Sequence, residues 1–396
     1  MEEAVGLLRR LVSVDTSNPP GNETAAAELL RDFLEPAGVA CELVARDPRR
    51  ANLVARLRGG DGPVLCFLGH LDVAPARVLE WSRPPFAGEL ADGAVWGRGT
   101  VDMKSQLAAV ATAMASIARA GARPHGDVLL LALADEEVGD AEVGAPWLVE
   151  ARPDVRADFA VGEGAGERFD GDGGPFFTLD RGAKASCSPI TLKTHGRSGD
   201  ASLPGAAPNA LAELARLLTR LPEAPPPEAR ALLRNALAGS TFTPVRVETP
   251  TESNIVPNEA TCELYGAVLP EATREGVERE LRALLGDGDY ELDVPEPQGG
   301  STSPLGTPLH HALEAFLGRH DPGAKIEPIL GYGYSDCHTF RTAWDATVYG
   351  FIPFRHADPL DNLTTKHGPD ERIQVRDLSF QVECARWLAL ADLGGN

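Results

Sequence analysis

Five short segments of the chain place histidine or acidic side chains where a metal ion can be bound. The first is Gly69-His70-Leu71-Asp72-Val73, which follows the apolar run from Val64 to Leu68. Because successive side chains of a strand point to opposite faces, we expect His70 and Asp72 on the same side, just past a buried strand. A histidine with a carboxylate two residues on is typical of a metal-binding imidazole held by a partner. On its own, a His-x-Asp pair is more often part of a surface turn.

The other four segments put acids or a histidine at comparable positions. Asp102 lies where a glycine-rich turn enters a helix, and the acidic run 135–137 follows an apolar strand. Glu163 stands between two glycines after another strand, and His367 precedes the last helix. Each segment also fits a surface loop, and Asp102 fits a helix N-cap. Their shared position at strand exits and helix entries favours one common site, because ligands bind at the carboxyl ends of strands in open α/β sheets.

The residue types in these segments suit a site with two metal ions. Two histidines and three carboxylates form a donor set that zinc, cobalt or manganese prefers. One carboxylate bridging two cations, with one histidine and one carboxylate terminal to each, uses all five. Two ions about 3.5–4 Å apart bind a shared water, lower its pKa and polarise a carbonyl. A further acid beside the ligands then acts as the general base.

The residues between these segments predict the elements that position them. Apolar side chains at helical spacing alternate with nearly all-apolar strands. Such runs predict an α/β fold with a mostly parallel sheet and helices on both faces. The predicted elements are a helix carrying Leu7, Leu8, Leu11 and Val12, helices 23–34 and 103–120, and strands 52–55, 64–68, 128–134 and 159–161.

The pattern changes near residue 187, where a smaller α+β unit begins. It is predicted to contain strands 188–194, 242–248, 260–269 and 289–294, helices 210–221 and 270–285, and the proline-rich stretch 222–227. Residues 297–303, Pro-Gln-Gly-Gly-Ser-Thr-Ser, are typical of a linker. Afterwards βα character resumes with helix 307–318, strand 346–351 and helix 375–392. We therefore expect one α/β domain built from residues 1–186 and 299–396, with a smaller domain over 187–298 inserted.

Composition excludes several classes of partner. The formal net charge of −21 argues against nucleic acid and anionic membranes, which both need basic protein surface. The six cysteines are far apart and form no Cys-x-x-Cys pair, which favours free thiols over a disulfide framework.

The N-terminal residues lack the basic and then apolar pattern of a signal peptide. No apolar run approaches the roughly 20 residues that span a bilayer. We expect a cytoplasmic protein.

With these motifs in order along nearly the whole chain, the sequence resembles the co-catalytic zinc amidohydrolases and peptidases of the M20 group. That group includes acetylornithine deacetylase, succinyl-diaminopimelate desuccinylase, aminoacylase-1 and glutamate carboxypeptidase. The matching segments are 16–23 (Thr-Ser-Asn-Pro-Pro-Gly-Asn-Glu), 69–73, 97–104, 134–139, 162–163, 253–257 (Ser-Asn-Ile-Val-Pro), 335–336 and 367–371 (His-Gly-Pro-Asp-Glu).

The resemblance implies a role for each residue of the site. His70 and Glu163 match ligands of one zinc ion, and Glu137 and His367 match ligands of the other. Asp102 matches the bridging carboxylate. These five residues would hold two divalent ions, zinc in the first place and cobalt or manganese as alternatives.

Two further acids match residues that act without binding the ions. Glu136 matches the general base that takes a proton from a water bridging the metals and returns it to the leaving nitrogen. Asp72 matches the carboxylate that orients His70. The resemblance also implies that the inserted domain is a lid or dimerisation domain, so that the chain forms a homodimer.

The chain departs from the family's pattern in the inserted domain. The family's lid histidine, which reaches the substrate carbonyl oxygen, is replaced by Asp200, and an ionised aspartate donates no hydrogen bond to an oxyanion. The family's lid arginine, which holds a substrate carboxylate, is replaced by Ala267. His195 is a candidate replacement donor, although it fits a surface histidine equally well. Asn254 is a further candidate substrate contact.

We therefore expect a dinuclear metallohydrolase that cleaves an amide bond of a small molecule or short peptide. Deacylation of an N-acyl amino acid or amine and hydrolysis of a small peptide remain open. The alternative is a metal-binding or regulatory relative without hydrolytic activity, because the lid histidine and arginine are missing. The acid at Glu136 argues against that alternative, since a non-catalytic protein has no need of it.

Overall fold

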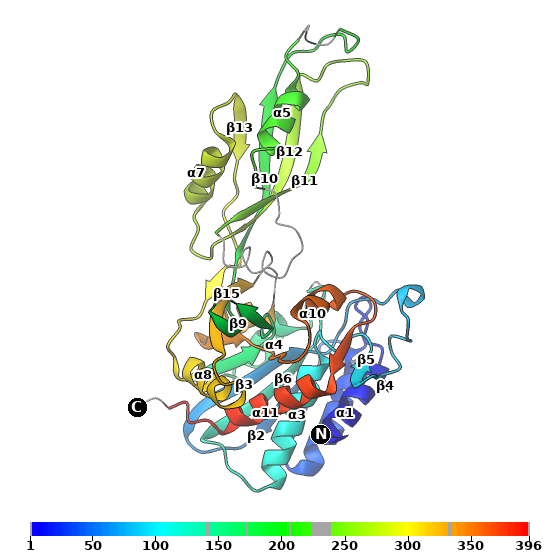
Figure 1. Ribbon diagram of the computed structural model, residues 1–396, viewed down its shortest axis with the longest axis vertical. Coiled ribbons are helices and arrows are strands. Elements are labelled where there is room, and N and C mark those ends of the chain that lie inside the picture. The colour runs from blue at the N-terminus through cyan, green and yellow to red at the C-terminus, as the bar shows by residue number, and fades with distance from the viewer. Residues whose placement is uncertain are drawn as a thin grey trace. The chain divides into compact units, whose positions relative to one another are not determined.

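The fold is seen in a computed structural model of the chain that describes residues 2–139, 142–171, 173–203, 205, 207–222, 239–331 and 335–394. The chain forms two compact units (Figure 1), a larger one over Met1–Gly182 and Ser303–Asn396 and a smaller one over Ala183–Thr302. The sequence predicts these boundaries at 187 and 298. The smaller unit begins earlier because its first strand starts before the change in composition that marked the boundary in the sequence.

The larger unit is built around a mixed sheet whose central strands are parallel. The strands follow the order β1-β2-β6-β3-β7-β16-β9. Strand β3 pairs in parallel with β6 and β7, and β7 pairs in parallel with β16. Antiparallel strands flank this centre, and β8 and β15 pair with β9. The bounds are β1 (Ala40–Val44), β2 (Asn52–Leu57), β3 (Gly62–His70), β6 (Gly126–Leu133), β7 (Phe159–Gly162), β8 (Arg168–Gly171), β9 (Gly174–Ala183), β15 (Lys325–Gly331) and β16 (Thr347–Gly350).

Helices cover both faces of this sheet, as the continuous apolar strands predicted. Side chains of β6 alternate between two cores, with Val128, Leu130 and Ala132 in one and Leu129, Leu131 and Leu133 in the other. The first core includes α1, α2, α3, α8 and α11, and the second includes α4 and α9. Figure 1 shows α1, α3 and α11 packed side by side. The helices are α1 (Glu2–Ser13), α2 (Glu23–Leu34), α3 (Lys104–Arg119), α4 (Ala145–Ala151), α8 (Pro308–His320), α9 (Asp336–Trp344), α10 (Pro359–Thr365) and α11 (Val375–Leu390).

The remaining regular elements of the larger unit are short. A small sheet has the order β17-β5-β4. Its strands are β4 (Glu89–Ala91), β5 (Ala94–Trp96) and β17 (Arg372–Gln374). Two 3-10 helices cover Glu35–Ala37 and Val78–Glu80, and β14 (Ser301–Thr302) lies where the chain returns to the larger unit. The α/β fold with a mostly parallel core is therefore confirmed.

The smaller unit is an antiparallel sheet with helices packed on one core. Its strands follow the order β11-β12-β10-β13, and every pair in it is antiparallel. Apolar side chains of the sheet form a second cluster with those of α5 and α7. The elements are β10 (Ala185–His195), α5 (Ala210–Leu218), β11 (Thr241–Glu248), β12 (Glu259–Val268), α7 (Arg274–Leu285) and β13 (Tyr290–Asp293).

Differences from the predicted elements lie mainly at their ends. Helix α7 begins at Arg274 instead of 270, because the Thr273 side chain accepts a hydrogen bond from the Gly276 N–H and caps the helix there. Most of the proline-rich stretch 222–227 lies outside the described residues. Among the helices of the described ranges, none has the length and apolar character needed to cross a membrane.

Candidate metal centre

The central parallel strands bring three of the candidate ligand segments to one edge of the sheet. His70 is the last residue of β3 and is in register with Leu133, the last residue of β6. The acidic run that contains Glu136 follows β6, and Glu163 follows β7. Since β6, β3 and β7 are parallel neighbours, their carboxyl ends lie together.

Asp102 reaches the same place on a loop that a buried carboxylate holds. Glu371 is fully buried, and its Oε2 accepts hydrogen bonds from Arg98 Nη1 (2.6 Å) and from the Gly99 N–H (3.0 Å). Its Oε1 accepts from the N–H groups of Val101 (2.6 Å) and Asp102 (3.0 Å). Gly99 has φ +86, and a Cβ there would lie 2.7 Å from a methyl carbon of Val73, so glycine is required. Glu371 therefore fixes the backbone that carries Asp102.

Two groups of potential ligands meet at Asp102. His70 Nε2 lies 3.0 Å from Asp102 Oδ1 and 3.9 Å from Glu163 Oε2. His367 Nε2 lies 3.1 Å from Asp102 Oδ2 and 3.0 Å from Glu137 Oε2. Within each group all ligand atoms lie within 4.8 Å of one another. The structure thus brings together all five residues that the sequence suggested as ligands, with one oxygen of Asp102 facing each histidine.

These distances fit divalent ions. Zinc binds nitrogen and oxygen donors at about 2.0–2.2 Å, so two donors of one tetrahedral ion lie roughly 3.4 Å apart. The donor separations of 3.0–3.9 Å straddle that value. The three carboxylates are at most 10% exposed and lie together. Such a concentration of buried negative charge favours the binding of cations.

Asp72 links His70 to the loop after β6. His70 Nδ1 lies 3.0 Å from the Asp72 backbone oxygen and 3.6 Å from Oδ1. The fully buried Asp72 carboxylate also accepts hydrogen bonds from the N–H groups of Glu136 (3.2 Å) and Glu137 (3.1 Å). Asp72 therefore contacts one candidate ligand through its backbone oxygen, and its carboxylate positions the loop that carries another.

Glu136 lies beside the ligands but in neither group. Its Oε2 is 3.9 Å from His70 Nε2, and its side chain is 11% exposed. Burial, and then the neighbouring carboxylate of Glu163, raise the pKa of Glu136 well above its usual range. A carboxylate with a raised pKa is suited to accept and return a proton near neutral pH.

Beneath these residues lies a polar network that joins Asp72 to residues without a predicted role. Asn18 Nδ2 donates to Asp72 Oδ2 (2.9 Å) and to Asp135 Oδ1 (3.0 Å). The buried Arg50 forms hydrogen bonds with both oxygens of Glu23, and its Nη2 lies 3.2 Å from Asp135 Oδ1. The partners come from four separate segments. Three of these segments, 16–23, 69–73 and 134–139, carried a signal as matching motifs, whereas Arg50 carried none.

Lys366 is a further residue that the sequence analysis left without a role. Its Nζ lies 3.0 Å from Asp102 Oδ2 and 3.5 Å from Glu163 Oε2. Burial disfavours the ammonium, but these two carboxylates outweigh it and raise the pKa of Lys366 well above its ordinary value. The side chain keeps 41% of its surface exposed, so a permanent positive charge stands at the rim of the ligand groups.

The three suggested substrate contacts belong to the smaller unit. Asp200 Oδ1 accepts a hydrogen bond from the Ser202 N–H (2.9 Å), so this carboxylate closes its own turn. His195 Nε2 lies 3.0 Å from Glu291 Oε1 in a partly exposed pair. The backbone oxygen of Asn254 accepts from the Ala201 N–H (3.0 Å), which joins the loops that carry Asn254 and Asp200.

Comparisons with known proteins point to one family. A model of peptidase family M20/M25/M40 matches residues 66–390. The chain is 31% identical to the succinyl-diaminopimelate desuccinylase of Delftia acidovorans over 355 residues, which cover 85% of this chain and 86% of that one.

Solved structures share the whole fold. The aminopeptidase PepT from Bacillus cereus aligns with a TM-score of 0.68 and 16% identity, over 100% of this chain and 99% of that one. The YXEP protein of Bacillus subtilis, described as a dinuclear metal binding peptidase, aligns with a TM-score of 0.60 and 15% identity, over 98% and 97% of the two chains. The chain therefore belongs to peptidase family M20/M25/M40, a family of metal-dependent hydrolases that act on carbon–nitrogen bonds.

Proposed function

We propose that this chain hydrolyses an amide bond of a small substrate with two divalent metal ions, most suitably zinc. His70, Asp102 and Glu163 would hold one ion, and Asp102, Glu137 and His367 the other. The observation that carries the proposal is the sharing of Asp102, whose two oxygens lie 3.0 and 3.1 Å from two different histidines. Two ions bound there would lower the pKa of a shared water and polarise the substrate carbonyl.

Glu136 supplies the proton transfers that the reaction needs. The attacking water must lose a proton, and the leaving nitrogen must gain one. Glu136 lies next to His70 without belonging to a ligand group, and its raised pKa lets it perform both transfers. Asp72 keeps it in place through the Glu136 N–H.

The substrate class is an N-acyl amino acid or amine, or a short peptide. A relative that is 31% identical is named for removal of a succinyl group from such a nitrogen. The alternative of a non-hydrolytic relative, based on Asp200 and Ala267, would leave Glu136 without a function. The family to which the chain belongs favours the hydrolase.

The decisive experiment replaces Glu136 by glutamine. Glutamine keeps the size and hydrogen bonding of the side chain but cannot carry the proton. We expect Glu136→Gln to bind the same number of metal ions as the unaltered chain and to lose about 10²–10⁴-fold in turnover. Glu80→Gln, at an exposed position whose partner is Arg77, is the matched control. Elemental analysis and hydrolysis of a panel of N-acyl amino acids and dipeptides measure both outcomes, and near-normal turnover of metal-loaded Glu136→Gln would assign the base elsewhere.

We also propose that the smaller unit serves as the lid and as the contact between two copies of the chain. The contact between copies is supported by β11, which pairs with β12 on one side, is an edge strand among the described residues, and leaves Val245 and Val247 exposed by 60% and 48%. Sedimentation analysis tests the contact. We expect Val247→Lys to convert a dimer to a monomer, whereas a chain that is already monomeric would contradict the proposal.

A further inference from the structure

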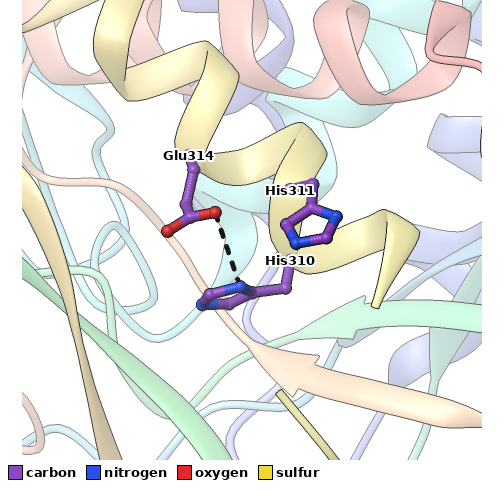
Figure 2. A group of neighbouring side chains, drawn as sticks. All are labelled: His310, His311 and Glu314. Carbon is purple, nitrogen blue, oxygen red and sulfur yellow. Dashed lines mark ion pairs between the residues drawn. The ribbon is translucent and has the colours of Figure 1, made fainter. Parts of the chain in front are cut away.

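A third group of potential metal ligands lies on α8, and it shares no residue with the candidate metal centre. His310, His311 and Glu314 each offer one ligand atom, and these atoms lie within 4.8 Å of one another. Figure 2 shows the three side chains along α8, with the carboxylate of Glu314 facing the ring of His310. None of the three takes part in the function proposed above.

The spacing along the helix suits a chelate. His310 and Glu314 are four residues apart, so their side chains lie on one face in adjacent turns. His310 Nδ1 is 3.7 Å from Glu314 Oε2. That separation is too long for a hydrogen bond, but two donors of one ion at about 2.1 Å lie roughly 3.4–3.7 Å apart. His311 adds an imidazole nitrogen from the next position along the helix.

The ring of His310 is held in position and lacks a partner for one nitrogen. Its side chain is 13% exposed, and Nδ1 is buried without a hydrogen-bond partner among the described residues. The ring packs edge-on to Tyr349 with centroids 6.3 Å apart, and Thr307 caps the helix by accepting from the His310 N–H. A buried nitrogen without a partner costs free energy, which a bound ion would offset. Burial lowers the pKa of His310 and outweighs the Glu314 carboxylate, which raises it, so the neutral form that binds metals is favoured.

We propose that His310, His311 and Glu314 bind a divalent transition-metal ion, so that the chain holds a third ion on α8. Two imidazoles and one carboxylate favour Zn²⁺, Ni²⁺ or Cu²⁺ over Mg²⁺ and Ca²⁺, which prefer oxygen ligands throughout. Three protein ligands leave at least one coordination position for water or a small ligand from solution. The formal net charge of −21 concentrates cations near the protein.

A second histidine–glutamate pair, which joins the end of α8 to α11, provides the matched control. His320 Nδ1 lies 3.3 Å from Glu383 Oε2, closer than His310 lies to Glu314. In the part of the chain that the structure describes, no third ligand completes this pair. The ring of His320 stacks on Phe316 with centroids 4.5 Å apart. If a histidine beside a carboxylate were sufficient to bind zinc, both pairs would do so.

The test counts ions on the full chain. The protein is stripped with a chelator, dialysed against buffered Zn²⁺ and analysed for zinc per chain. We expect His310→Asn and Glu314→Gln each to hold one ion fewer than the unaltered chain, and His320→Asn to hold the same number. Titration calorimetry with Zn²⁺ should show the α8 site weakened at least tenfold, since even residues that only support a ligand are worth about 10–100-fold in metal affinity. His70→Ala should lose zinc at the metal centre and keep the ion on α8.

Two results would overturn the proposal. In one, the His310→Asn and Glu314→Gln chains hold as much zinc as His320→Asn. In the other, the combined losses of His70→Ala and His367→Ala already account for every ion of the unaltered chain. Glu314 is half exposed, so its glutamine variant folds even where a change at His310 disturbs packing.

Discussion

Replacing Glu371 by glutamine tests whether the metal centre depends on a buried carboxylate that touches no ion. Glu371 and Arg98 are 0% and 2% exposed, and Glu371 accepts four hydrogen bonds, three of them from the loop that ends at Asp102. Glutamine keeps the shape but leaves the Arg98 charge without its partner, and it turns an NH₂ group toward N–H donors. Breaking a buried ion pair from one side costs about 3–5 kcal/mol.

This loss is a large part of the stability of a domain, which is about 5–15 kcal/mol. In a unit of this size each kcal/mol lowers Tm by about 2–4 °C, so we expect Tm to fall by about 6–20 °C. We expect metal affinity to fall by about 10–100-fold, as is usual when a residue that orients a ligand is lost. Because both proposed ions share Asp102, the two affinities should fall together.

Differential scanning calorimetry of chelator-treated protein measures the first effect, and titration calorimetry with Zn²⁺ measures the second. Asp370→Asn is the matched control, since Asp370 is the preceding residue, is only partly buried and accepts from Ser82 instead of the Asp102 loop. A Glu371→Gln chain with an unchanged Tm and unchanged zinc affinity would refute the reasoning.

Three further predictions concern the metal ions and the substrate. His70→Ala and His367→Ala should each lose at least one ion by elemental analysis, because each histidine faces a different oxygen of Asp102; full occupancy in both would contradict the two-ion site. Hydrogen bonds that the His367 ring donates to the carboxylates of Asp102 and Glu137 raise the pKa of His367 to about 9. Below pH 9 the ring is therefore protonated and must lose its proton to bind an ion. Zinc affinity should therefore rise about tenfold per pH unit between pH 7 and 9 and level off above pH 9. Calorimetry in two buffers of different ionisation enthalpy should detect the proton that is released on binding. A zinc affinity that does not change with pH would contradict the role of His367 as the group that releases this proton. Asp200 adds negative charge and Ala267 offers no cation, so an N-acyl substrate that ends in an amide should be hydrolysed faster than the same substrate with a carboxylate. A preference for the carboxylate substrate, together with unchanged rates in Asp200→Asn, would be evidence against a role of Asp200 in substrate selection.

The parallel core and its helices were predictable because burial on two faces leaves a strong signal. Strands such as β6 are apolar at nearly every position, and α2 occupies the residues predicted for it. The predicted ligands also lie close together, because the carboxyl ends of parallel strands lie at the same edge of the sheet. Strand β15 is only partly buried and lacks a continuous apolar run, so the sequence analysis did not predict it.

The supporting contacts were beyond the reach of local patterns. Arg98 and Glu371 are separated by 273 positions, and neither residue type predicts a buried partner so far along the chain. The same holds for Lys366, whose charge reads from the sequence as an ordinary surface lysine although its Nζ lies 3.0 Å from Asp102. Long-range polar pairing depends on the completed fold, so only coordinates reveal it.

The origin of His367 and Glu371 near the end of the chain has a consequence for biosynthesis. A ribosome delivers the chain from its N-terminus, so β3, β6 and β7 emerge well before the segment that carries these two residues. Until that segment is released, one ligand group lacks its histidine and the Asp102 loop lacks the carboxylate that holds it. A nascent chain therefore carries most of the proposed acidic ligands before both proposed sites are complete, and loading of both sites with metal would have to follow the emergence of residues 367–371.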